Sequence, residues 1–399
     1  MTSNVSAARN QLFGRHLRRH WLMQEGASFL NHGSFGACPK AVLAAQSAIR
    51  EEMERAPDQF FRQRIMPQSE HSAMRPVAQE LAKLVGTNGE RLAFVENATS
   101  GVCAVLECQE FGVGDEILIL DHTYNAVRLA VEHHCRKTGA SCVTARLPIP
   151  ATPENLVEAI LAAVTPRTRL AVLDHITSAS ALLLPLENIV PELRAKGVRV
   201  LVDGAHCVGQ IALNLEALGA DYYVSNAHKW LFAPKGSAFL YARPENSETL
   251  IPLAVSHYNH TGFPARFHFV GTRDVSSWLS VPSALKFIEK IGGFSSMQCY
   301  CRALAIESAS QLKNIGAVPV ASEACTANMR TFQLPQRRAA QTEDGAALMT
   351  QLWQRHKIQI VANVLGGRFL MRLSAQVYVD AEEFEQLAQT LEIDGWPGR

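Results

Sequence analysis

Short apolar runs alternate with amphipathic stretches between about residues 91 and 242. Runs rich in β-branched and aromatic residues predict strands at 91–97, 116–122, 169–176, 198–204, 221–228 and 236–242. Amphipathic stretches between them predict helices at 99–111, 125–139 and 189–197. Nearly continuous apolar strands separated by helices are typical of a mostly parallel sheet with helices on both faces. The pattern therefore predicts an α/β fold.

The pattern changes after Thr272. Helices are predicted at 281–293, 303–315 and 381–391, and strands at 331–334, 359–363 and 368–378. This order favours a separate α+β module. We expect an N-terminal helical segment at 1–30, a large domain at 31–280 and a small C-terminal domain at 281–399.

Composition excludes several classes of protein. The 399 residues are 47% hydrophobic and 19% charged, which is typical of a folded chain rather than a disordered one. With 38 Lys+Arg against 37 Asp+Glu, the chain lacks the basic surplus of a nucleic-acid-binding protein. No apolar run approaches the roughly 18–20 residues that cross a bilayer, so we expect neither a nucleic acid nor a membrane as partner.

Cysteine usage favours a reducing compartment. The nine cysteines are an odd number without a CxxC pair, so we expect free thiols, no structural metal and a cytoplasmic protein. The basic stretch at 7–21 resembles a transit peptide in composition. A basic first helix packed on the body is the alternative that we favour, because core-like sequence resumes at Phe29.

Polar groups end several of the predicted strands. In open α/β sheets, ligands bind beyond the carboxyl ends of the strands. The groups at these positions are 97–100, 121–124, 203–206 and 225–230. The sequence contains no GxGxxG, GxxxxGK[ST], HExxH or GxSxG, which removes the main support for nicotinamide, P-loop, zincin and nucleophile-elbow chemistry.

Asp203 and Lys229 are the most informative pair. Asp203 ends a fully apolar run, where a carboxylate needs a cationic partner. Lys229 follows after one crossover and a strand, which is long enough to return to a neighbouring parallel strand. The pair suits pyridoxal phosphate, with Lys229 forming a Schiff base and Asp203 keeping the pyridine nitrogen protonated. A buried ion pair without a cofactor is the alternative.

The stretch DGAHCVGQIALNLEALGADYYVSNAHKWLFAPKGSAFLYAR resembles the lysine-site region of the class V aminotransferases, which are fold-type I pyridoxal-phosphate enzymes. LNHGSFGACP, HKWLFAPKG and GTRD are most similar to the isopenicillin N epimerase-like branch, and the resemblance runs from about residue 10 to residue 390. It implies pyridoxal 5′-phosphate as cofactor, Lys229 as the Schiff-base lysine and Asp203 as the partner of the pyridinium. It also implies that His206 and His175 lie near the ring oxygen, with His175 as a catalytic group.

The resemblance further implies a phosphate site. Thr99 and the Ala98 backbone begin a helix after a strand, where N–H groups can bind phosphate. His228 matches a phosphate-contacting histidine. Asn226 stands where the family usually has a serine, so either Asn226 or a shifted Ser225 would make that contact.

Other matches concern the substrate and a second subunit. Thr272, in Gly271-Thr272, matches a loop that reaches the partner's cofactor phosphate and implies a homodimer with shared active sites. Tyr124 matches the aromatic residue that stacks on the pyridine ring and is a candidate acid–base group. Arg372 matches the arginine that binds the α-carboxylate, as its planar guanidinium suits. Substrate-side candidates also include Asn31, His32 and Arg62.

The resemblance leaves several reactions open. The shared step is removal of the Cα proton of an amino acid by Lys229. Epimerisation, C–S bond cleavage in a cysteine conjugate or sulfoxide (as in ergothioneine biosynthesis) and transamination are all compatible with it. Cysteine desulfuration is disfavoured because residues 355–371 contain no cysteine and the last one is Cys325. A non-catalytic binding protein is disfavoured because Lys229 and Asp203 are both present.

Overall fold

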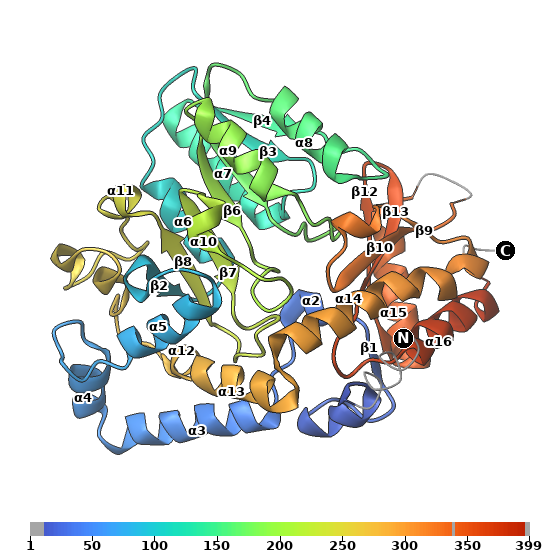
Figure 1. Ribbon diagram of the computed structural model, residues 1–399, viewed down its shortest axis with the longest axis horizontal. Coiled ribbons are helices and arrows are strands. Elements are labelled where there is room, and N and C mark those ends of the chain that lie inside the picture. The colour runs from blue at the N-terminus through green and yellow to red at the C-terminus, as the bar shows by residue number, and fades with distance from the viewer. Residues whose placement is uncertain (1–11, 337–339, 396–399) are drawn as a thin grey trace.

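A seven-stranded sheet forms the centre of the larger part of the molecule (Figure 1). The computed structural model describes residues 12–336 and 340–395. The strand order is β2-β8-β7-β6-β5-β3-β4, and only β8 runs antiparallel to its neighbours. The strands are β2 (Leu92–Val95), β3 (Glu116–Leu120), β4 (Ser141–Ala145), β5 (Thr168–Asp174), β6 (Arg199–Asp203), β7 (Tyr222–Asn226) and β8 (Ala238–Ala242). The predicted mostly parallel sheet is therefore confirmed.

Helices cover both faces of this sheet because successive strand residues point to opposite sides. Leu201 packs with helices α6 (Ala98–Glu107) and α7 (Asn125–Thr138). Its neighbour Val202 packs in the core on the other face. The helices of that face are α3 (Lys40–Arg55), α5 (Met74–Leu84), α8 (Pro153–Ala162), α9 (Leu186–Ala195) and α13 (Val281–Ile291).

The chain returns from β6 to β7 as predicted. Only the short helix α10 (Leu215–Leu218) separates these strands along the chain, and they pair in parallel with Asp203 opposite Val224. On the other side, β5 places Asp174 directly opposite Asp203. The carboxyl ends of three adjacent strands therefore lie together, and Lys229 follows the last of them.

A second sheet forms the C-terminal part of the fold. Its order is β12-β13-β10-β9, all antiparallel, and helices α14 (Gly293–Gln311), α15 (Thr342–His356) and α16 (Ala381–Ile393) pack around it. The strands are β9 (Val318–Pro319), β10 (Met329–Gln333), β12 (Val361–Leu365) and β13 (Arg368–Ser374). The predicted strand at 368–378 ends early at Ser374, and the predicted helix at 303–315 begins ten residues sooner, at Gly293.

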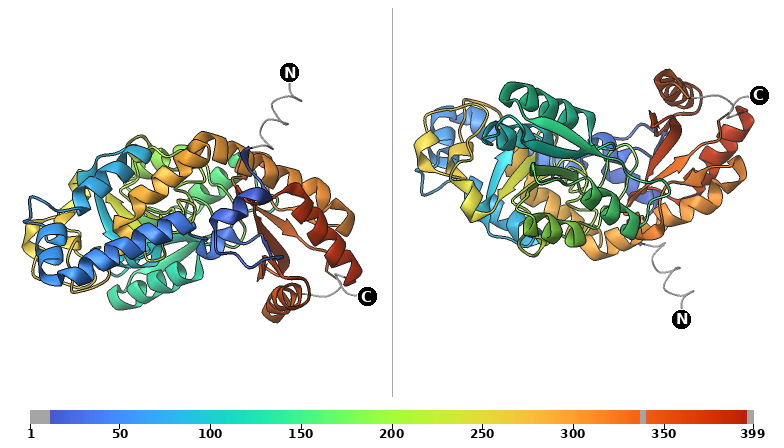
Figure 2. Two further views of the ribbon diagram at one scale, coloured as in Figure 1. Left: turned by 90° about the horizontal axis from the view of Figure 1, so that it is seen from below. Right: turned by 90° about the horizontal axis from the view of Figure 1, so that it is seen from above.

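The N-terminal segment packs on this C-terminal part, which forms one end of the elongated molecule (Figure 2). Strand β1 (Ser28–Phe29) pairs with β11 (Ile358–Gln359), and the 3-10 helix η1 (Arg15–His20) brings Arg18 into an ion pair with buried Glu383. The first basic helix thus packs on the body, although residues 1–11 lie outside the described part of the chain. The three-domain division remains a prediction.

None of the helices in the described ranges is long and apolar enough to cross a membrane. All nine cysteines are free thiols, as expected.

Candidate active site

A cavity of about 410 Å³ lies at the carboxyl ends of β5, β6 and β7. Its volume falls within the usual range for small-molecule sites. All four polar groups expected at the strand ends contribute to it. Its lining includes Asn97, Ala98, Thr99, Ser100, Tyr124, Asp203, Ala205, His206, Asn226, His228 and Lys229.

Lys229 is a buried amine with few polar partners. Its Nζ lies 3.3 Å from His206 Nε2. Burial, reinforced by the positive charge of Arg372, lowers the pKa of Lys229 to about 8, and Asp203 opposes this shift. Burial also holds the pKa of His206 well below its usual value, so this imidazole is neutral. A Lys229 amine that loses its proton near neutral pH can serve as both nucleophile and base.

Two carboxyl groups on neighbouring strands line the same cavity as this amine. Asp203 accepts a hydrogen bond from the Ala205 amide at 3.0 Å, and burial raises its pKa. Asp174 also lines the cavity, and burial followed by the nearby Asp203 charge raises its pKa well above the usual value. Our sequence interpretation missed Asp174. The signal that identifies it is the one used for Asp203, since both residues end an apolar strand.

The start of α6 forms another part of the cavity wall. Asn97 caps the helix by accepting from the Ser100 amide, and the Ala98 amide donates to Asn226 Oδ1 at 2.8 Å. The Ala98 N–H is therefore already used, whereas the Thr99 amide has no acceptor among the described residues. A helix start with a free N–H and two hydroxyl side chains is suited to an anion such as phosphate.

Asn226 rather than Ser225 faces this wall. The Ser225 hydroxyl is fully buried and donates to the Gly204 carbonyl at 2.5 Å, because consecutive residues of β7 point to opposite faces. The possible replacement of Asn226 by Ser225 is thus excluded by geometry. His228 lines the cavity beside Asn226, and its Nδ1 bonds the Ser237 carbonyl at 2.9 Å.

His175 does not reach the cavity, contrary to our expectation of a catalytic role. It follows Asp174 in the chain, so its side chain points to the other side of β5. There its Nδ1 lies 2.9 Å from the Tyr223 hydroxyl.

Two further candidates also lie elsewhere. Arg62 is exposed and paired with Asp58 at 2.7 Å, and it is not part of the cavity lining. Thr272 is exposed and does not line the cavity of its own chain.

Arg372 lies behind the cavity wall, fully enclosed. Its guanidinium donates to the Ser178 carbonyl at 2.6 Å, to Asn31 Oδ1 at 3.1 Å and to Ser34 Oγ at 3.0 Å. Burial lowers its pKa to about 10, and its Nε has no partner among the described groups. Ser34 and Ser178 line the cavity themselves, so Arg372 is one residue removed from it.

His32 contacts the backbone of Lys229 and does not line the cavity. Its Nδ1 lies 2.6 Å from the Tyr378 hydroxyl, and its Nε2 lies 2.9 Å from the Lys229 carbonyl oxygen. It is completely buried, and burial lowers its pKa to about 3. A neutral imidazole bridging two parts of the chain fixes the backbone from which Lys229 projects.

These residues fit pyridoxal phosphate. His206 Nδ1 and Asp174 Oδ2 are buried without partners in the described structure, which is costly unless a bound group satisfies them. Lys229 supplies the amine, Asp203 a carboxylate and the start of α6 an anion site. An amine, a carboxylate and an anion site, which are complementary to the aldehyde, the pyridine nitrogen and the phosphate of the cofactor, thus line one cavity.

Comparison with known proteins agrees with this fit. Residues 37–387 match the sequence profile of the family described as Aminotransferase class-V. The chain therefore belongs to the class V aminotransferase family, and it is a pyridoxal-phosphate-dependent enzyme. The family resemblance inferred from the sequence motifs is confirmed.

Relatives within the family carry out different reactions. L-cysteine desulfhydrase of Arabidopsis thaliana is 30% identical over 92% of this chain and 88% of its own length. Isopenicillin N epimerase of Amycolatopsis lactamdurans is 33% identical over 91% of this chain and 94% of its own. Hercynylcysteine sulfoxide lyase of Schizosaccharomyces pombe is 24% identical over 96% of this chain and 98% of its own.

Among solved structures, the cystine C–S lyase C-DES in complex with cysteine persulfide has a TM-score of 0.78. It is 21% identical and covers 92% of this chain and 97% of its own. This likeness supports the fold-type I architecture and carries no further assignment.

Proposed function

We propose that this enzyme cleaves the Cβ–S bond of L-cysteine or of a cysteine conjugate. With L-cysteine and water, the net reaction would yield pyruvate, ammonia and hydrogen sulfide. The observation that carries the proposal is the set of groups that line the cavity. Lys229 and Tyr124 can accept or donate protons, and no cysteine is among the lining residues in the described structure. The names of the desulfhydrase and sulfoxide lyase relatives support the same chemistry.

Lys229 would remove the Cα proton. Its lowered pKa supplies a neutral amine near physiological pH, and the neutral His206 at 3.3 Å adds no competing charge. Bound pyridoxal phosphate supplies the electron sink that stabilises the resulting negative charge. Asp203 would keep the pyridine nitrogen protonated, since a carboxylate there favours the positive ring.

Arg372 would bind the substrate carboxylate by exchanging acceptors. Two of its N–H contacts end on the side chains of Asn31 and Ser34, which are neutral. A carboxylate forms stronger, charge-assisted bonds with guanidinium than neutral oxygens do. The substrate would therefore displace these side chains while the Ser178 carbonyl continues to hold the arginine.

Tyr124 would protonate the departing sulfur. It lines the cavity and is 47% exposed, so its hydroxyl is in reach of both substrate and solvent. Because the cavity lining in the described residues contains no thiol, sulfur would leave as a free thiol or sulfide rather than as a protein persulfide.

Epimerisation is the second candidate, favoured by the 33% identity to isopenicillin N epimerase. It requires a second acid on the face of Cα opposite Lys229, and Tyr124 is the group available for that role. The two reactions thus use the same residues and differ in whether Tyr124 delivers a proton to carbon or to sulfur.

Proton NMR in deuterated buffer tests the proposal. Holoenzyme is incubated with L-cysteine, L-cystine, cysteine S-conjugates and sulfoxides, with the Lys229→Ala variant as control. Release of pyruvate together with thiol supports C–S cleavage. Exchange at Cα with an intact side chain and appearance of the D-enantiomer would replace it by epimerisation, and formation of the 2-oxo acid with sulfur retained would replace it by transamination.

We also propose a homodimer in which Thr272 completes the partner's site. Thr272 is exposed, and so is Phe35 of the cavity lining, by 73%. Leu253 and Val255, in the segment before Thr272, are exposed as well. Large exposed apolar side chains favour an interface. Analytical ultracentrifugation of holoenzyme would show a dimer, and a monomer with full activity would contradict the proposal.

We further propose a cytoplasmic location. Nine free thiols suit a reducing compartment. Fractionation of the native cells followed by immunodetection tests this, and recovery from an organelle would contradict it.

A further inference from the structure

A tight loop at residues 177–182, between β5 and α9, contacts Arg372 at the cavity wall. The Thr177 amide donates to the Leu182 carbonyl at 3.0 Å and closes the loop. Near the tip of the loop, the Ser178 carbonyl accepts from the Arg372 guanidinium at 2.6 Å. The position of this loop therefore sets where the guanidinium lies.

His122 is a buried side chain that contacts this loop from a neighbouring segment. It is 4% exposed, and its Nδ1 lies 2.7 Å from Ser180 Oγ. Ser180 is buried as well, and its Oγ also lies 2.7 Å from Thr177 Oγ1, which accepts from the amide of Leu182 at 2.8 Å. A chain of hydrogen bonds thus runs from the imidazole through the interior of the loop.

The segment that carries His122 is fixed to the central sheet. It follows β3, and the Asp121 amide donates to the Ala145 carbonyl of β4 at 2.9 Å. The Asp121 side chain accepts from the Leu147 amide at 3.0 Å, and the same carboxylate lies 3.9 Å from His122 Nε2. A carboxylate on that side favours a proton on Nε2, which leaves Nδ1 to accept from the Ser180 hydroxyl.

We propose that His122 is a positioning residue for substrate binding, which acts through Ser180 and the loop on the Arg372 guanidinium. The inference rests on the role proposed for Arg372 in binding the substrate carboxylate. His122 itself does not line the cavity. When Arg372 exchanges its side-chain acceptors for the substrate carboxylate, the Ser178 carbonyl is the acceptor that remains. Loss of the imidazole would leave the buried Ser180 hydroxyl without this partner and release the loop that carries that carbonyl.

Titration of holoenzyme with L-2-aminobutyrate and with propylamine, followed by the visible absorption of the bound cofactor, tests the inference. L-2-aminobutyrate has the size of cysteine but no sulfur to release, and propylamine is the same molecule without the carboxylate. We expect His122→Phe and Ser180→Ala each to raise the dissociation constant for L-2-aminobutyrate by about fivefold or more. The dissociation constant for propylamine should not change, because propylamine has no group for Arg372.

Two further variants serve as controls. His122→Asn places an amide atom where Nδ1 was, so it should keep the affinity for L-2-aminobutyrate within about twofold of wild type. His134→Phe makes the matched change at another buried histidine, which lies in α7 and outside the cavity lining. It should change neither dissociation constant.

A double-mutant cycle tests whether His122 acts through Ser180. If it does, the double variant His122→Phe/Ser180→Ala should bind L-2-aminobutyrate no more weakly than the weaker-binding single variant. Additive losses would overturn this route.

Two other results would overturn the inference while leaving the role of Arg372 intact. One is unchanged affinity in His122→Phe when Arg372→Leu loses the preference for L-2-aminobutyrate over propylamine. The other is equal weakening of both ligands by His122→Phe, which would show a purely structural role. Absence of that preference in wild type would overturn the role of Arg372 and the inference together.

None of these measurements requires turnover. Failure of C–S cleavage would therefore be recognised separately, by the absence of pyruvate. Circular dichroism and thermal unfolding establish that each variant is folded before its affinity is compared.

Discussion

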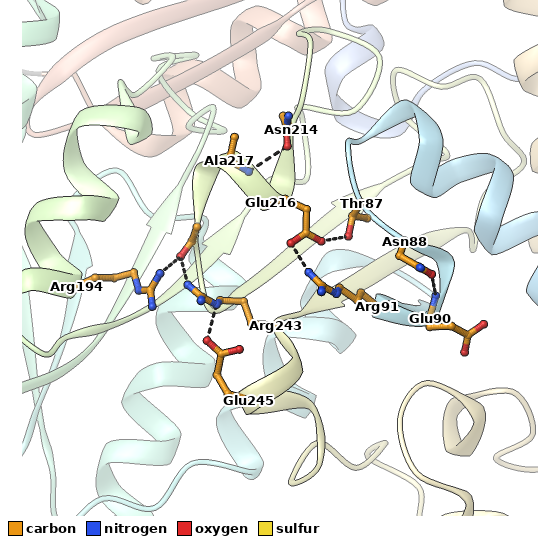
Figure 3. A network of polar contacts seen from close by, with 11 residues as sticks. Thr87, Asn88, Glu90, Arg91, Arg194, Asn214, Glu216, Ala217, Arg243 and Glu245 are labelled. Atoms are coloured by element: carbon orange, nitrogen blue, oxygen red, sulfur yellow. Dashed lines mark hydrogen bonds and ion pairs between the residues drawn. The ribbon is translucent and has the colours of Figure 1, made fainter.

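The two ends of the central-sheet strands, called here the amino-terminal and the carboxyl-terminal edge, differ in whether their polar side chains have partners. At the amino-terminal edge, Arg91 pairs with Glu216 and Arg243 pairs with Glu245 at 2.7 Å (Figure 3). Arg243 also donates to the Gly219 carbonyl. These groups are partly exposed and satisfied by one another. Such a network stabilises the connections between strands and leaves little unpaired for a ligand.

At the carboxyl-terminal edge, buried polar atoms are left without partners. Asp174 Oδ2 and His206 Nδ1 belong to this group in the described structure, and Arg372 Nε, which reaches the wall of the same cavity from the second sheet, is a further unpartnered atom. Each unsatisfied buried group costs about 1–3 kcal/mol. Several unsatisfied polar groups in one place can form hydrogen bonds with a bound molecule. Single unpaired atoms also occur near the amino-terminal edge, at Arg75 Nε and Gln109 Oε1, so it is the gathering of such atoms around one cavity, more than charge density, that marks the active edge.

The largest expected difference between the edges is in activity. Lys229→Ala should lower turnover by at least about 10³-fold and abolish the visible absorption of bound cofactor, because both nucleophile and base are lost. The double variant Arg91→Ala/Arg243→Ala should keep turnover within about threefold, since the work of the opposite edge is structural. Pyruvate release and absorption spectra measure both, and equal losses at the two edges would remove the contrast.

Substitutions of the two carboxyl groups at the active edge should also differ in their effect on turnover. Asp203→Asn should reduce turnover by about 10²-fold or more, because a neutral amide cannot hold the pyridinium. Asp174→Asn should keep turnover within about tenfold, because burial and the neighbouring Asp203 charge raise the pKa of Asp174 and so favour its neutral form, which an amide resembles. Steady-state kinetics compare the two at matched cofactor content. A greater loss in Asp174→Asn would show that Asp174, and not Asp203, carries the charge.

The sequence predicted the parallel sheet and the Asp203–Lys229 pair because both depend on local signals. Apolar runs define strands, and a short crossover returns the chain to the adjacent strand. Strand β4 was missed because, among Ser141–Ala145, only Ala145 is buried and no apolar run marks it.

The side of β5 that His175 occupies could not be predicted as reliably. A shift of one residue moves a side chain to the opposite face, and an apolar strand buried on both faces gives no alternation to fix it. The contacts of Arg372 with Asn31 and Ser34 are likewise invisible locally, since about 340 residues separate these partners.

The burial of the Lys229 amine at the active edge should also affect how stability depends on pH. The pKa of Lys229 is about 8 in the folded protein and about 10.4 in an unfolded chain. Between these values the unfolded state binds more protons, so this group makes stability rise with pH. The free energy of unfolding of cofactor-free wild type, minus that of Lys229→Met, should therefore increase by about 2.5 kcal/mol from pH 8 to pH 10.5.

Urea unfolding at several pH values measures this difference. Lys196→Met, at an exposed position after α9, is the matched control because its side chain is not buried. Subtracting the variant cancels the contributions of the other titratable groups, which both proteins share. A flat difference would mean that the Lys229 amine is hydrated in the folded state.

The smallest effect belongs to the ion pair between Arg91 and Glu216. Their side chains are 34% and 40% exposed, so solvent screens the attraction, and a double-mutant cycle with alanine should give a coupling of about 0.2–1 kcal/mol. The coupling should shrink further in 1 M salt. Thr87 also donates to Glu216, so the cycle is repeated in a Thr87→Val background to separate that hydrogen bond. Urea unfolding measures each corner of the cycle. A coupling above about 2 kcal/mol would mean that this edge depends on its charges as strongly as the active edge does, and the distinction between the two edges would then rest on the unpaired atoms alone.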